Sequence, residues 1–162
     1  MERELRLGQQ NVLFDREATV ALYRDTFAVA DADWCGCASC KNFALQRSKI
    51  YPGAFLQFLS ELGINPLREW EAFDYDFDSG NTNRHLYGGW FLFVGELLAG
   101  MDNQSKQAME TLSYWFTASF PAPALPTGMK ICAVEFSVKV PWILIETDKR
   151  SPNPVAPKHH GI

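Results

Sequence analysis

The sequence lacks the short motifs that identify several common enzyme classes. It contains no G-x-x-x-x-G-K-[ST] or G-x-G-x-x-G nucleotide-binding pattern, no H-E-x-x-H metalloprotease pattern and no G-x-S-x-G nucleophile pattern. It also has no internal repeat. These absences exclude the motif-bearing members of those classes, so the function has to be inferred from other residues.

Long apolar runs and an excess of positive charge are missing as well. No run approaches the ~18 apolar residues of a membrane-spanning helix, and the longest apolar stretch, 88–100, is interrupted by glycines and Glu96. The first 14 residues contain no apolar segment typical of a secretory signal. Lys and Arg number 15 against 19 Asp and Glu, a net charge of −4 that disfavours binding to nucleic acid or an anionic membrane. We therefore expect a soluble, cytoplasmic protein with reduced thiols.

The apolar residues that are present predict an α+β fold. Their period-two alternation predicts strands at 17–31, 71–81, 85–97, 113–120 and 130–140. Helices are expected at about 38–49 and 52–62, the second carrying one apolar stripe and ending at Gly63. We predict a single domain over residues 1–147, with a mostly antiparallel sheet of four to five strands and both helices packed on one face. A half-open barrel is the alternative, and residues 148–162 are expected to form a Pro-rich C-terminal tail.

Three of the four cysteines lie within six residues, in the pattern C-x-C-x-x-C. Thiolates at this spacing, from Cys35, Cys37 and Cys40, can share one zinc ion, which takes four ligands in structural sites. The fourth ligand would then come from elsewhere in the chain. The candidates are Cys132, His85, His159, His160 and Asp33. Cys132 is the preferred one, because alternation places it on the inward face of a distant strand.

Two other interpretations of the cysteines remain open. Cys37 and Cys40 form a C-x-x-C pair at the expected start of a helix, where a thiol pKa is lowered and reactivity increases. Trp34 is similar to the aromatic residue that precedes such pairs in thioredoxin-like proteins, but no parallel βαβ unit is predicted around it. Alternatively, the cysteines are small, partly buried residues that pack a turn and react slowly.

A second candidate site surrounds Gly88 and Gly89. Paired glycines in a strand indicate a bulge or a close approach of two backbones. His85, Tyr87 and Trp90 flank them and could line a groove for a ligand or partner, or pack into the core. An acid–base pair, if there is one, would join His85 to Asp76 or Asp78 across the hairpin turn.

Together these features favour a small binding or interaction domain over an enzyme. A structural zinc would be held by Cys35, Cys37, Cys40 and Cys132. We call the segment 35–40, which carries the first three of these ligands, the cysteine turn. The size and acidity of the domain are compatible with a protein partner, and neither nucleic acid nor membrane is expected to bind. The alternative function is that of a thiol-dependent oxidoreductase that uses Cys37 and Cys40.

Overall fold

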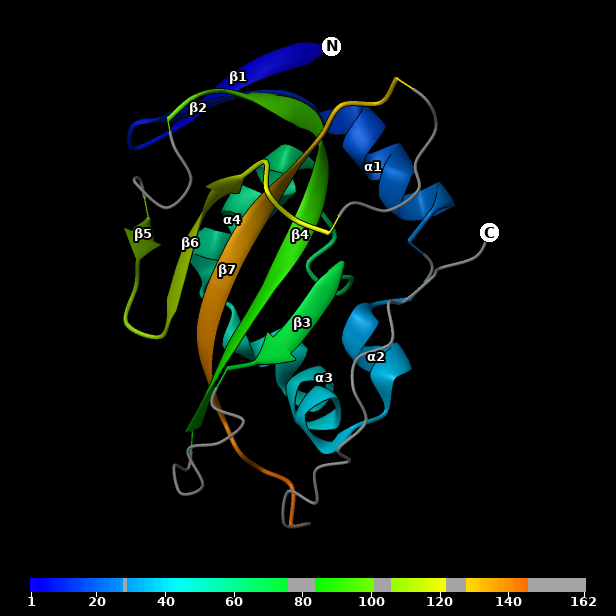
Figure 1. Cartoon of the computed structure of the whole chain (residues 1–162), viewed down its shortest axis with the longest axis vertical. Helices are drawn as coiled ribbons and strands as arrows, with labels where there is room; N and C mark the ends of the chain where they lie inside the picture. The colour runs from blue at the N-terminus through cyan, green and yellow to red at the C-terminus, as the bar shows by residue number, and fades with distance from the viewer. Residues whose placement is uncertain (28, 76–83, 101–105, 122–127, 146–162) are drawn as a thin grey trace.

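A computed structural model describes residues 1–27, 29–75, 84–100, 106–121 and 128–145. These residues form one seven-stranded antiparallel sheet and four helices (Figure 1). The α+β prediction is confirmed, although there are more strands than the expected four to five and more helices than the expected two. No helix in the described ranges is long and apolar enough to cross a membrane. The predicted tail at 148–162 lies outside the described residues.

The sheet is built around its longest strand, β4. The strands are β1 (Glu2–Leu7), β2 (Gln10–Asp15), β3 (Glu71–Asp74), β4 (Arg84–Ala99), β5 (Gln107–Ala108), β6 (Leu112–Thr117) and β7 (Ile131–Pro141). Their order is β1-β2-β4-β7-β6-β5, and β3 pairs with β4 as well. On one side β4 pairs first with β3 and then with β2, and on the other side with β7. One strand therefore fixes the positions of three others.

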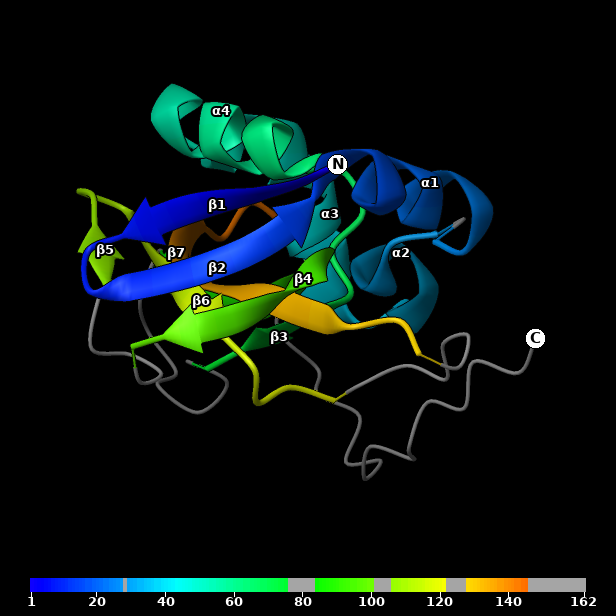
Figure 2. The ribbon, with the colours of Figure 1, turned by 90° about the horizontal axis from the view of Figure 1, so that it is seen from above.

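The two predicted helices are present and share one face of the sheet. The helices are α1 (Arg16–Asp25), α2 (Asp31–Cys35), α3 (Ala38–Ile50) and α4 (Gly53–Leu62). Figure 2 shows α3 and α4 on one face, with α1 and α2 along one side of the molecule. The left-handed Gly63 ends α4, as its position after the apolar stripe predicts.

Aromatic side chains join these helices to the sheet. Phe55 of α4 packs against Tyr114 of β6 and Phe91 of β4, with ring centroids 4.8 and 6.3 Å apart. Phe43 of α3 packs against Tyr87 at 5.3 Å and Phe136 at 6.4 Å. Buried rings contribute large apolar areas and preferred tilted contacts, which accounts for the 14% aromatic content of the chain.

The predicted strand at 17–31 is wrong, because most of this segment forms α1, and its last residue, Asp31, begins α2. The apolar alternation also satisfies a helical period, in which Thr19, Leu22 and Tyr23 form one buried stripe. Asp15 supplies the N-cap, since its Oδ1 accepts a hydrogen bond from Ala18 N at 2.9 Å. Capping and packing override the strand preference of Val20 and Tyr23.

The β1–β2 hairpin was not predicted. Gly8 turns the chain with φ of 60°, and Gln10 follows as a fully buried polar residue. The Gln10 side chain exchanges two hydrogen bonds with the backbone of Phe116 in β6, at 2.7 and 2.8 Å. Since β4 and β7 lie between these strands in the sheet order, the sheet must curve to bring β2 and β6 together.

Gly88 and Gly89 mark a close approach rather than a bulge. The registers of β4 with β3 and with β7 run through both glycines without a shift. A Cβ at Gly89 would lie 2.2 Å from Glu71 O and 2.8 Å from Phe136 Cζ. A Cβ at Gly88 would lie 2.5 Å from Tyr75 Cε2. Glycine is required here because the neighbouring strand and rings occupy the space of a side chain.

Gly89→Ala should therefore destabilise the fold by about 1–3 kcal/mol, the usual cost of overpacking. Urea denaturation of the wild type and the variant measures the difference. Gly53→Ala is the matched control, because its Cβ meets nothing within 4 Å. It should change stability by less than about 1 kcal/mol, in the stabilising direction. Equal effects of the two substitutions would contradict the close approach at Gly89.

Candidate metal centre

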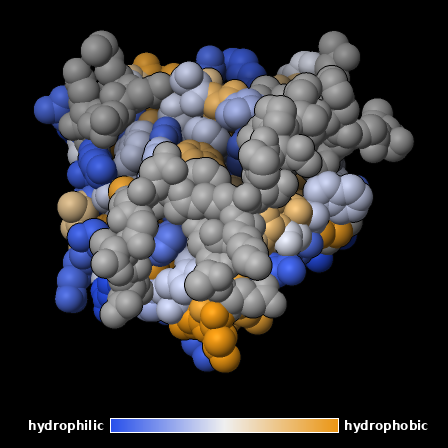
Figure 3. Space-filling view, turned by 60° about the horizontal axis from the view of Figure 1, so that its bottom comes forward, coloured by the Kyte–Doolittle hydropathy of each residue, from blue (hydrophilic) through white to orange (hydrophobic). Residues whose placement is uncertain are grey.

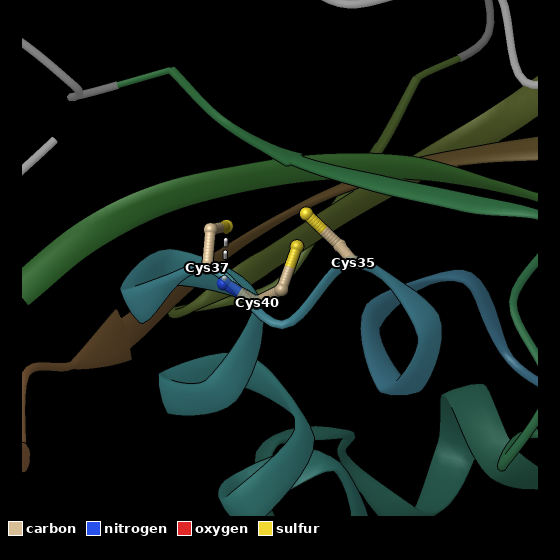
Figure 4. Close-up of side chains that lie close together, drawn as sticks. All are labelled: Cys35, Cys37 and Cys40. Atoms are coloured by element: carbon tan, nitrogen blue, oxygen red, sulfur yellow. Dashed lines mark hydrogen bonds between the residues drawn. The ribbon is translucent and has the colours of Figure 1, made fainter. Parts of the chain in front are cut away.

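The three clustered cysteines converge in space. The Sγ atoms of Cys35, Cys37 and Cys40 all lie within 4.8 Å of one another. Figure 4 shows the three side chains projecting to the same side of the turn that links α2 to α3. Cys35 and Cys37 are exposed, while Cys40 is buried. The site is therefore a sulfur-rich cluster formed by two exposed residues and one buried residue.

The local backbone brings these sulfur atoms together. Cys35 is the last residue of α2, and Gly36 ends that helix in the left-handed conformation with φ of 71°. Cys37 is then the N-cap of α3, and its Sγ accepts a hydrogen bond from Cys40 N at 3.4 Å. A left-handed residue between two helices reverses the chain sharply, which suits glycine. Three sulfur atoms thus meet within one short turn.

The three thiols do not ionise independently. Hydrogen bonds from the Cys40 thiol and from the backbone of Cys40 and Ser39 lower the pKa of Cys37 to about 5, although partial burial opposes this. The adjoining Cys37 sulfur and burial raise the pKa of Cys40. Cys37 is therefore a thiolate at neutral pH, with the protonated Cys40 thiol as its donor. A cation placed among the sulfur atoms would favour their ionised forms.

A buried ionic network holds α2 beside α3. Arg47 of α3 donates from Nη1 to both carboxylate oxygens of Asp33 at 3.1 Å and from Nη2 to Glu69 Oε1 at 2.7 Å. Glu69 Oε1 also accepts from Ala32 N at 3.2 Å. Burial raises the pKa of Glu69, while Arg47 opposes that shift. Because Asp33 and Ala32 belong to α2, this network fixes the helix that ends in Cys35.

A second polar network holds the start of α3 against the sheet. Ser39, which lies between Cys37 and Cys40, donates from Oγ to Asp74 Oδ2 at 2.9 Å. The same oxygen lies 2.8 Å from His85 Nδ1. Tyr87 donates its hydroxyl to Ser39 O at 2.9 Å. The partner of His85 is thus Asp74, whereas the proposed partners at 76 and 78 lie outside the described residues.

Cys132 does not join the cluster. It is fully buried on β7, and its thiol donates to Thr117 O at 3.1 Å. It is not part of the group of converging ligand atoms found among the described residues. Asp33 is engaged with Arg47, and His159 and His160 lie outside the described ranges. The structure therefore brings together three of the four predicted metal ligands.

The three residues proposed to line a groove do not share one face. His85 and Tyr87 point to the side of β4 that carries α3, where Tyr87 is buried against Phe43. Trp90 lies three residues after Tyr87 in the same strand and packs against Phe73, with ring centroids 5.2 Å apart. Because side chains alternate along a strand, Trp90 faces the opposite side of the sheet. The interpretation of these residues as packing residues fits their contacts better than a common groove.

Figure 3 shows the surface at the lower end of the molecule, where only the coloured atoms belong to the described residues. Hydrophilic and apolar residues are interspersed among these coloured atoms, with one compact apolar group at the lower edge.

Comparisons with protein-family models, with curated proteins and with solved structures find no match. The chemistry of the cysteine cluster is therefore the principal basis for a functional proposal.

The low pKa of Cys37 gives a direct prediction for the reduced, metal-free protein. Its rate of alkylation by iodoacetamide should rise with an inflection near pH 5, since the thiolate is the nucleophile. Mass spectrometry of the Cys37 peptide measures this rate. Cys40→Ala should move the inflection upward, towards the ordinary value of 9.0, because the main hydrogen-bond donor is removed.

Cys132→Ser is the control, and it should leave the inflection unchanged because Cys132 lies apart from the cluster. A wild-type inflection at or above pH 8, or one that Cys40→Ala does not move, would contradict the assignment of the thiolate to Cys37.

Proposed function

We propose that this protein is a metal-binding interaction domain whose cysteine turn holds a thiophilic ion, zinc being the first candidate. The observation that carries the proposal is the convergence of the Cys35, Cys37 and Cys40 sulfur atoms within 4.8 Å. Zn–S bonds of about 2.3 Å in a tetrahedral site separate sulfur atoms by about 3.8 Å. Small side-chain rotations would close that difference.

The ionisation of the cluster supports cation binding. Cys37 supplies one thiolate at neutral pH, and the raised pKa of Cys40 means that its proton must leave when a metal binds. Thiolate ligands select zinc, Cu(I) and similar ions over calcium and magnesium, which prefer oxygen ligands. Three neighbouring negative sulfur atoms repel one another unless a cation neutralises them.

The role that we propose for the ion is structural. It would join Cys35 at the end of α2 to Cys37 and Cys40 at the start of α3, across a turn whose residues 35–37 are exposed. The fourth coordination position would be taken by water or by a ligand outside the described residues. A protein partner remains a prediction that rests on the size and acidity of the chain.

Thiol–disulfide exchange is the second candidate function, and a separate observation favours it. Cys37 is an exposed thiolate at a helix N-terminus, and the buried Cys40 lies beside it. The Cys37 thiolate would attack one sulfur of a substrate disulfide and release the other as a thiolate that takes up a proton. The Cys40 thiol would lose its proton and attack the mixed disulfide, so that the Cys37–Cys40 disulfide and the reduced substrate are formed.

Metal analysis separates the two functions. Protein purified without an affinity tag under reducing conditions should contain one zinc ion per chain by mass spectrometry. Cys35→Ser, Cys37→Ser and Cys40→Ser should each lower zinc content and affinity by about tenfold or more. Cys132→Ser is the control and should retain zinc. Metal-free protein that cannot be loaded with zinc would overturn the proposal, and catalysed disulfide exchange by that protein would support the second function.

Zinc affinity should also depend on pH. Binding displaces the proton that Cys40 holds in the metal-free protein, so protons compete with zinc at low pH and affinity rises as pH rises. Competition with a chromogenic chelator between pH 6 and 8 measures the effect, which should be about tenfold per pH unit for each proton released. Affinity that is independent of pH over this interval would contradict thiolate coordination by Cys40.

A further inference from the structure

A pocket of about 380 Å³ lies between α1 and the end of α4, apart from the cysteine turn. Figure 2 shows that α1 lies next to the C-terminal end of α4. Gly63 forms the point of closest approach, since a Cβ there would lie 2.6 Å from Arg16 O. The volume falls within the range of small-molecule sites.

Three arginines line this pocket, although the chain carries a net charge of −4. Arg24 is neutralised by a bidentate pair with Asp25, at 2.7 and 2.8 Å. Arg16 and Arg68 have no carboxylate within 4.0 Å in the described part of the chain, and both are half-buried. Two guanidinium groups without a counter-ion in one pocket form a local positive field.

Backbone carbonyls hold both guanidinium groups in place. Arg16 Nε donates to Ser60 O at 3.2 Å in the last turn of α4. Arg68 Nη1 donates to Phe27 O at 2.6 Å and Tyr23 O at 3.3 Å, at the end of α1. These bonds offset the negative ends of the two helices. They leave both Nη groups of Arg16, and Nε and Nη2 of Arg68, without a hydrogen-bond partner among the described residues.

The remaining walls of the pocket combine apolar and polar groups. Val20, Tyr23 and Ile64 supply apolar surface, and Ser60 and Asn65 supply polar side chains. Guanidinium groups recognise carboxylate and phosphate oxygens through paired N–H donors. A small ligand with one anionic group and an apolar part would use both kinds of wall.

We propose that this pocket binds a small organic anion through Arg16 and Arg68, the anionic group being a phosphate or a carboxylate. Each guanidinium is fixed by one edge and presents its remaining donors, so little side-chain freedom is lost on binding. The apolar wall of Val20 and Ile64 takes the uncharged part of the ligand. Binding does not require an occupied cysteine turn.

Titration of the full-length, reduced protein with inorganic phosphate and, separately, with succinate tests this proposal. Two-dimensional NMR at low ionic strength should show saturable shifts of the Val20, Gly63 and Asn65 amides. Arg16→Gln and Arg68→Gln should each weaken binding by about tenfold or more, the effect of losing a charge-assisted hydrogen bond. Arg68→Lys keeps the charge and should weaken binding less than Arg68→Gln. A response to one probe only identifies the anionic group.

Arg6→Gln is the matched control, because Arg6, which is more exposed than Arg16, likewise donates from Nε to a backbone carbonyl, Gly8 O, at 3.0 Å. It lies on β1, outside the pocket, and should leave binding unchanged. Absence of saturable shifts with both probes would overturn the proposal. So would shifts that persist in Arg16→Gln and Arg68→Gln, or that Arg6→Gln removes equally.

Discussion

The buried guanidinium of Arg47 determines where the cysteine turn lies. Arg47 belongs to α3, and its guanidinium forms ion pairs with Asp33 of α2 and with the fully buried side chain of Glu69, which precedes β3. Breaking such a buried pair leaves an uncompensated charge and costs about 3–5 kcal/mol. That is a large part of the about 5–15 kcal/mol that stabilises a small domain. The loss of Arg47 or Glu69 would therefore remove the contacts that hold α2 beside α3.

Two anchors act on the turn from opposite sides. The Arg47 network fixes Cys35 through α2, while Ser39, Asp74 and Tyr87 fix the start of α3, where Cys37 and Cys40 lie. The aromatic core holds α3 against β4 and β7. A site built in this way is preorganised, because its supporting residues are themselves held by hydrogen bonds and packing. The metal would then join parts that the fold has already brought together.

Local patterns predicted α3, α4, four of the strands and the cysteine trio, because each depends on spacing within one short segment. Polar contacts between distant segments could not be predicted in this way. Arg47 meets Glu69 across 22 residues and Ser39 meets Asp74 across 35, and no periodicity indicates which polar side chains pair. The α1 segment fits both a strand and a helix period, and the N-cap at Asp15 decides between them. Alternation placed Cys132 correctly on an inward face but could not show that β6 lies beside it.

In the proposed metal site, three cysteine thiolates of a single turn are the protein ligands. X-ray absorption spectroscopy of the zinc-loaded protein measures the ligand set directly. We expect a shell of three sulfur atoms at about 2.3 Å together with one oxygen or nitrogen ligand. A shell of four sulfur atoms, or one made only of oxygen and nitrogen ligands, would contradict it.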